Sequence, residues 1–132
     1  MARARKGQRA ADFHEWRKQI KALWYELRLL EPVGLHIRRD VKALRSAEAW
    51  LGQEHDVVVL CDELSKDGPQ GDPRIDLDRV RLVGDGYQRE LRRKALAGTK
   101  RIYAPTPREY ANSVRHGWKR WHTSQKRRHG AE

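Results

Sequence analysis

The sequence repeats one spacing of apolar residues, at alternating steps of three and four, and this spacing limits the folds open to it. In the clearest stretch, residues 12–31, the apolar positions are Phe13, Trp16, Ile20, Leu23, Leu27 and Leu30. Such spacing places apolar side chains on one face of a helix. The only β-like run, 57–59, has no second β-rich segment with which to pair. We therefore expect an all-α fold.

Capping and helix-breaking residues mark where the first two helices begin and end. Asp12 is the expected N-cap of the first helix, and Pro32 ends it. A second helix is expected over 35–51. Gly52 follows, so this helix either passes through the glycine with a weak point or restarts after it.

The second half of the chain predicts two further helices after a polar loop over residues 65–74. The third runs from about 77 to 97, between Asp76 as N-cap and Gly98 as its end. The fourth begins at Pro107 and has Thr106 as its N-cap. Their core-facing stripes include the aromatic residues Tyr87, Tyr110, Trp118 and Trp121.

Four helices on 132 residues predict a single antiparallel four-helix bundle. The helical domain is expected over residues 12–122. Residues 1–11 form a basic N-terminal tail, and residues 123–132 form a basic C-terminal tail that is frayed from about Lys126. The single cysteine, Cys61, excludes an internal disulfide and is expected in the core.

The net charge of +11 is distributed unevenly along the chain. Residues 1–31 contain eight basic and four acidic side chains, and residues 32–47 contain four and one. Residues 48–78 contain two and nine, and residues 79–132 contain fifteen and four. We expect folding to bring the two ends together into one positive surface, whose partner is an anion.

A polar stripe lies beside the apolar stripe of the first helix. It consists of His14, Lys18, Lys21, Tyr25 and Arg28, with Arg17 at its edge. Like charges at this spacing repel one another unless an anion offsets them. A groove for an anion is one interpretation, and a basic face in contact with water is the other. Later cations belong to the same hypothesis: Arg89, Arg92, Arg93, Lys100, Arg101 and Lys119.

Motifs for catalysis, metals and cofactors are missing from the sequence. It contains no His-Glu-x-x-His motif and no glycine-rich phosphate loop, and His55 and Asp56 are expected to form a buried hydrogen-bonded pair. Base-reading motifs are also missing, so sequence-independent binding of RNA or DNA through the phosphate backbone is the alternative function. No apolar run reaches the roughly 20 residues of a membrane span, so we expect a cytoplasmic protein.

Two segments resemble the CHAD domain, the conserved-histidine α-helical domain. They are Phe-His-Glu-Trp-Arg-Lys-Gln-Ile-Lys-Ala-Leu-Trp-Tyr at 13–25 and Leu-Gly-Gln-Glu-His-Asp-Val-Val-Val-Leu at 51–60. Residues 89–94 and 98–105 also follow the family pattern. The resemblance covers about residues 12–121 and is to the second half of the domain.

The resemblance implies noncatalytic binding of inorganic polyphosphate at polyphosphate granules, without a cofactor. The family's histidine and basic positions correspond to His14, Arg17, Lys18 and Lys21, and its other basic helices to the later Arg and Lys clusters. CHAD domains usually contain two bundles, whereas this chain has length for one. The resemblance therefore also predicts a homodimer in which two copies rebuild the missing half.

Overall fold

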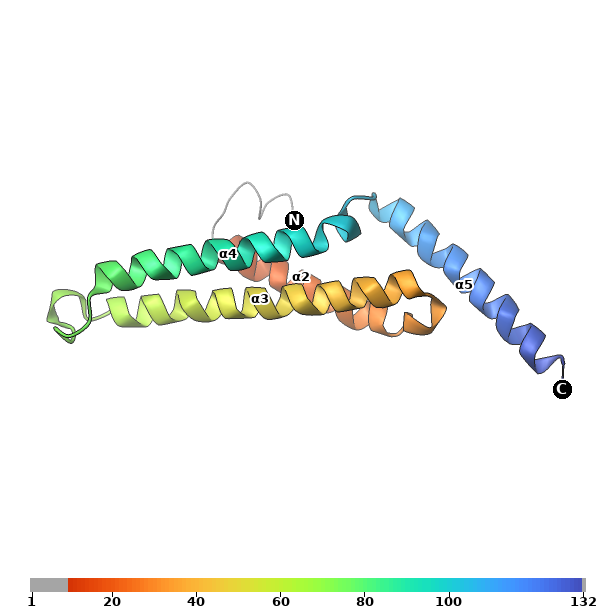
Figure 1. Ribbon diagram of the computed structural model, residues 1–132, viewed down its shortest axis with the longest axis horizontal. Coiled ribbons are helices and arrows are strands. Elements are labelled where there is room, and N and C mark those ends of the chain that lie inside the picture. The colour runs from red at the N-terminus through yellow and green to blue at the C-terminus, as the bar shows by residue number, and fades with distance from the viewer. Residues whose placement is uncertain (1–9, 132) are drawn as a thin grey trace.

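A computed structural model describes residues 10–131, which form four long helices and two short 3₁₀ turns and include no strand (Figure 1). The elements are α2 (Ala10–Arg28), η1 (Glu31–Val33), α3 (Leu35–Ser65), η2 (Gly68–Gln70), α4 (Leu77–Tyr103) and α5 (Pro107–His129). The expected all-α class with four helices is confirmed. Within the described range, no helix has both the length and the apolar character needed to cross a membrane.

The helix ends agree with the sequence at some positions and differ at others. Asp76 and Thr106 are N-caps as predicted, each accepting a hydrogen bond from the backbone N–H three residues later, at 3.1 and 3.2 Å. Asp12 is not a cap, because it lies inside α2. Residues 126–129, predicted to be frayed, are helical, since α5 continues to His129. The predicted N-terminal tail lies outside the described residues up to position 9.

Two glycines lie inside helices because another helix contacts them. Of the two alternatives for Gly52, the structure has α3 passing straight through it. A Cβ there would lie 3.1 Å from Nη2 of Arg17, so the missing side chain gives the guanidinium room. Gly98 was predicted to end its helix, but α4 continues to Tyr103. A Cβ at Gly98 would lie 3.1 Å from the Trp50 ring, so this glycine serves helix packing.

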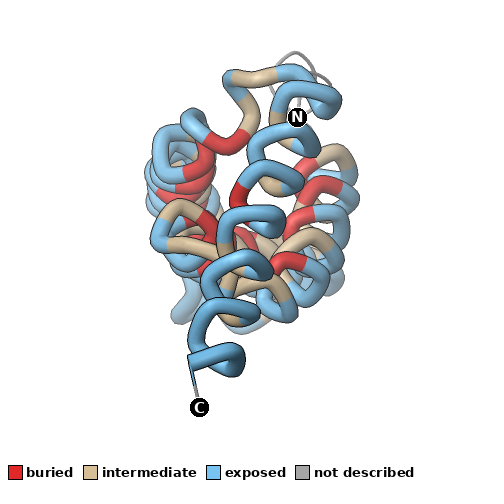
Figure 2. The backbone as a smooth tube through the Cα atoms, turned by 90° about the vertical axis from the view of Figure 1, so that its right-hand side faces the viewer, coloured by how far each residue is buried: buried red, intermediate tan, exposed pale blue. Residues whose placement is uncertain are grey.

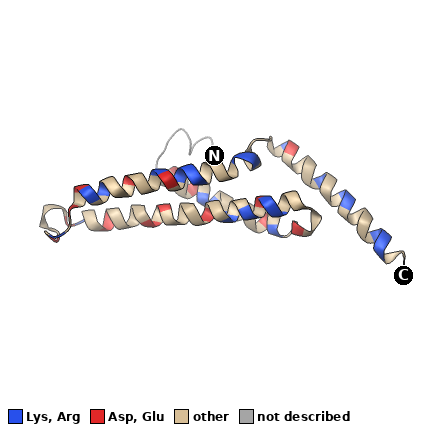
Figure 3. Ribbon diagram, viewed as in Figure 1, with Lys and Arg blue, Asp and Glu red and all other residues tan. Residues whose placement is uncertain are grey.

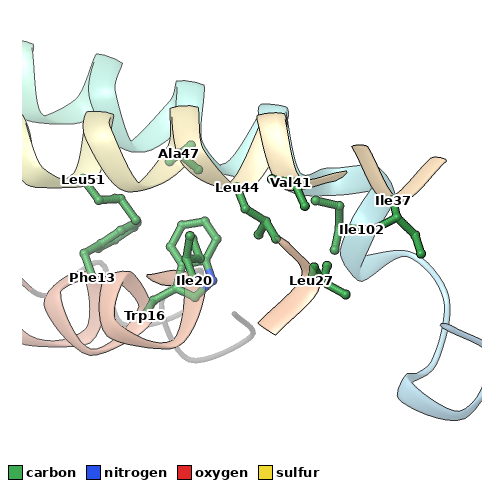
Figure 4. Close-up of a cluster of buried hydrophobic side chains, with 11 residues drawn as sticks. Phe13, Trp16, Ile20, Leu27, Ile37, Val41, Leu44, Ala47, Leu51 and Ile102 are labelled. Atoms are coloured by element: carbon green, nitrogen blue, oxygen red, sulfur yellow. The ribbon is translucent and has the colours of Figure 1, made fainter. Parts of the chain in front are cut away.

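The core lies where α2 and α4 pack lengthwise on the central helix α3 (Figures 1 and 4). Figure 2 shows the buried positions on the inner faces of these helices. Trp16 and Ile20 of the predicted α2 stripe are at most 2% exposed, and Leu44 and Leu51 of α3 are at most 1% exposed. Burying side chains of this size contributes about 1.5–3 kcal/mol each. This packing fixes which other faces of α2 and α3 meet.

The pair formed by α3 and α4 extends beyond the end of α2. In this part of the pair, Leu60, Val83 and Tyr87 are 55%, 65% and 51% exposed. Tyr87 is therefore not a core residue as predicted, because α2 does not cover its face. Cys61, also expected in the core, is only half-buried.

Helix α5 joins the packing through its first half and then projects away from the other helices (Figure 1). Tyr110 and Val114 pack on the core, and buried Gly117 approaches Val33 of η1. Beyond it Trp118 is 45% exposed, so its predicted core position is wrong. The positive surface expected from both chain ends does not include α5, since α5 does not pack along α2.

The start of α5 is held to α3 by one buried polar contact. The Tyr110 hydroxyl donates a hydrogen bond of 2.9 Å to Oδ2 of Asp40, which is 7% exposed. Arg101 of α4 lies 3.9 Å from the same carboxylate. Burial, followed by the bond to Asp40, raises the pKa of Tyr110 well above its ordinary value. The contact therefore joins three helices at one carboxylate.

We expect Tyr110→Phe to lower the free energy of unfolding by about 1–3 kcal/mol, because it removes a donor from a buried carboxylate. Urea denaturation followed by circular dichroism measures the change. Tyr87→Phe is the matched control, since its ring is 51% exposed, and it should change stability little. Equal stability of the two variants would contradict this role of Tyr110.

Candidate polyanion-binding groove

The polar stripe of α2 lies along its seam with α3. At one end the His14 ring stacks on the His55 ring, with centroids 4.6 Å apart. Arg17 follows, with Nε and Nη2 donating to Oε1 of Glu48 at 3.1 and 2.8 Å. Asp56 is exposed, so the predicted buried pair of His55 and Asp56 is replaced by a histidine stack. This end of the seam is occupied by contacts between the two helices.

Further along α2 the cations face solvent. Lys18 and Lys21 are exposed, and Lys18 makes only a long 3.4 Å contact with Glu15. The Arg28 guanidinium lies 5.0 Å from the centroid of the Tyr25 ring, a cation–π contact that orients it. This end of the stripe therefore offers ammonium and guanidinium groups to an outside anion.

Helix α3 adds a second row of cations that the sequence analysis did not assign to the site. Arg38, Lys42 and Arg45 recur at steps of four and three, so they share one helix face. Arg28 of α2 and these three residues line one groove of about 470 Å³. Trp24, Glu31 and Val41 complete its lining. The signal was present in the excess of basic residues over 32–47, at helical spacing.

The same row of α3 also reaches α4. Lys42 and its neighbour Arg39 line a second groove of about 350 Å³ together with Arg101 of α4. Lys42 thus lies between the two grooves, and cations of α2, α3 and α4 follow one another across this end of the molecule (Figure 3). We call this set the basic groove. It consists of the cations that line the two grooves, Arg28, Arg38, Arg39, Lys42, Arg45 and Arg101, together with Lys21, which is exposed on the α2 stripe that leads to Arg28.

The other predicted cations are placed differently. Arg92 donates to the buried carboxylate of Glu54 from Nε at 2.9 Å and also from Nη2, and its guanidinium lies 4.6 Å from the Phe13 ring centroid. Arg93 pairs with Glu90 on an exposed face, and this hydrogen bond lowers the pKa of Glu90. Three more predicted cations are exposed and line neither of the two grooves: Arg89, Lys100 and Lys119.

The groove is suited to bind an anion by charge and hydrogen bonding. Its guanidinium groups can donate two parallel hydrogen bonds to one phosphate, and its ammonium groups act as point charges. Among residues 10–131, no three His, Cys, Asp or Glu side chains gather as a metal site would require. Glu31 is the one carboxylate in the lining of the larger groove.

Arg92 and Arg93 form a matched pair that separates a structural cation from an exposed one. Arg92→Met should lower the free energy of unfolding by about 3–5 kcal/mol, because it leaves Glu54 buried without its partner. Arg93→Met should change the free energy of unfolding little, since its pair is exposed. Chemical denaturation measures both.

Adding Glu54→Met to Arg92→Met should restore much of the lost stability, because no unpaired charge then remains buried. If Arg92→Met is no less stable than Arg93→Met, Arg92 does not have this structural role.

Comparison with known proteins agrees with this geometry. The family model of the CHAD domain matches residues 1–65, which include α2 and the whole of α3. Neither curated proteins nor solved structures gave a match to the chain. The match covers the two helices that supply most of the basic groove. The CHAD domain is associated with polyphosphate binding in general, and it is generally a binding domain and not a catalytic one.

Proposed function

The first half of this chain belongs to the CHAD-domain family, and from that premise we propose that the protein binds inorganic polyphosphate without catalysis, in the basic groove. The observation that carries the proposal is that Arg28 of α2 and a row of three cations of α3 line a single groove. A linear polyanion in this groove contacts cations of both helices at once. On a single exposed helix face it would contact the cations of one helix.

The spacing of the groove cations suits a ligand that repeats one charged group. The helix rises about 1.5 Å per residue, so along the axis of α3 Arg38 and Lys42 lie about 6 Å apart, and Lys42 and Arg45 about 4.5 Å apart. A chain of phosphates presents negative charge along its whole length, and each cation finds a partner whatever the register. Binding of this type releases counterions and weakens as salt rises.

The aromatic residues at the groove favour polyphosphate over nucleic acid. Proteins that bind single strands without sequence preference commonly stack bases on exposed aromatic rings. At the groove, Trp24 is half-buried and stacks on Tyr25, with ring centroids 5.0 Å apart. Arg28 lies over the same Tyr25 ring. These rings orient cations, so they contribute little to the stacking of bases.

We extend the proposal to the residues at the His14 end and to the place of action. His14 and Arg17 orient the start of the seam through His55 and Glu48, and Lys18 continues the row toward Lys21. In the cell the ligand is long-chain polyphosphate at polyphosphate granules.

Removing four groove cations tests the proposal. The combined variant Lys21→Gln, Arg28→Gln, Lys42→Gln and Arg45→Gln should bind long-chain polyphosphate about 100-fold more weakly than wild type or worse, because phosphate contacts dominate such binding. Isothermal titration calorimetry at fixed salt measures the Kd. Helicity and melting temperature should stay close to wild type, since all four side chains are exposed.

The matched control removes the same number of lysines and arginines outside the groove: Lys94→Gln, Arg108→Gln, Arg115→Gln and Lys126→Gln. Its Kd should stay within a few-fold of wild type. The slope of log Kd against log salt should fall by about one for each groove cation removed. In the control variant the slope should stay close to its wild-type value. Equal losses in both variants would mean that net charge alone binds the ligand.

A further inference from the structure

An apolar groove lies at the opposite end of the molecule, between the last turns of α3 and the first turns of α4. It has a volume of about 580 Å³, and its apolar lining includes Val57, Leu60, Cys61, Val80, Val83 and Tyr87. Several of these side chains are more than half exposed, among them Val83 at 65%. Buried Gly84 forms part of the lining, where a Cβ would lie 2.9 Å from Sγ of Cys61.

Acidic side chains outnumber basic ones around this groove. Residues 55–87 contain eight Asp and Glu and four basic residues, Lys66, Arg74, Arg79 and Arg81. Two of the four are paired with local carboxylates, Lys66 with Glu63 at 2.6 Å and Arg74 with Asp72 at 2.7 Å. Figure 3 shows carboxylates along this end of α3 and α4. The groove therefore has a mainly apolar lining, in which Arg74, Asp76 and Arg79 are the charged residues, and it lies in a region of net negative charge.

The outer half of α5 has the complementary character. Trp118 and Trp121 lie together, with ring centroids 5.2 Å apart, and Trp118 is 45% exposed. Around them α5 is strongly basic, with Lys119, Arg120, Arg127 and Arg128 exposed and Glu109 as the acidic residue of its first turn. An amphipathic helix with an aromatic pair and positive flanks fits an apolar groove in a region of net negative charge.

We propose that α5 of one copy of this chain docks in the apolar groove of a second copy, with Trp118 and Trp121 as the inserted side chains. Within one chain this contact is not made, because the first half of α5 packs on η1 and the core, at the other end of the α3–α4 pair.

A two-fold pair forms this contact twice, because each copy gives one α5 and receives one. A buried tryptophan contributes on the order of 150–250 Å² of contact surface, and aromatic residues dominate the energetics of interfaces. The segment between α4 and α5, with Pro105 and Pro107, is short enough to set the direction of α5 in both copies.

Two single variants and their mixture test the exchange. Trp118→Glu disables the docking helix, and Val83→Glu disables the groove; both residues are exposed, so each variant should keep wild-type helicity. Sedimentation velocity in 150 mM salt, without polyphosphate, should show a wild-type dimer. In each variant the dimer dissociation constant should rise at least tenfold.

Mixing the two variants in equal amounts should restore a dimer, because the intact α5 of one fits the intact groove of the other. Leu29→Glu, at a residue 78% exposed and outside the groove, is the matched control and should stay dimeric. The proposal is overturned by a wild-type monomer, by a Trp118→Glu protein that dimerises normally, or by a mixture that stays monomeric. These readouts need no polyphosphate, so failure here leaves the proposed function standing.

Discussion

The packing of α2 against α3 is the interaction on which the rest of the structure depends. The buried stripe of α2, with Trp16 and Ile20 at its centre, meets Leu44 and Leu51 of α3. Because this stripe faces the core, the neighbouring stripe of α2 lies along the seam and meets the polar side of α3. The same hydrophobic contact that stabilises the fold thus aligns two rows of cations.

Several cations along these helices serve the fold and not an outside ligand. Arg17 bonds to Glu48 over Gly52, and Arg92 bonds to the buried Glu54. Like charges packed along a seam repel, and these carboxylates offset part of that repulsion. Arg28, Lys42 and Arg45 line the groove without a carboxylate partner among the described residues, so their charge is available for an anion. The acidic end of the α3–α4 pair lies away from it (Figure 3).

The sequence predicted the helices well because their stripes and caps are local features. Asp76 and Thr106 act on backbone groups three residues away, and such contacts follow from the neighbouring sequence. Gly98 and Arg92 could not be interpreted in this way. Their partners Trp50 and Glu54 are distant in the chain, so a helix end and a ligand contact were expected where the structure has helix packing and a buried ion pair.

The basic groove was also only partly predictable, because its cations come from segments that are distant in the chain. The α2 row was predicted from its spacing, but the α3 row was counted only as charge, since nothing local shows that residues 38–45 face Arg28. The exposed Trp118 and Tyr87 were assigned to the core because their stripes are helical. A stripe predicts a face, whereas the fold decides whether another helix covers it.

The central claim is that this groove recognises polyphosphate, and competition between ligands tests it most directly. Labelled long-chain polyphosphate bound to the full chain is challenged with unlabelled polyphosphate or with single-stranded RNA, at equal phosphate concentration and fixed salt. Our account predicts that polyphosphate displaces the label at a concentration at least tenfold lower than RNA does. Equal or better displacement by RNA would contradict it and indicate a general binder of phosphate backbones.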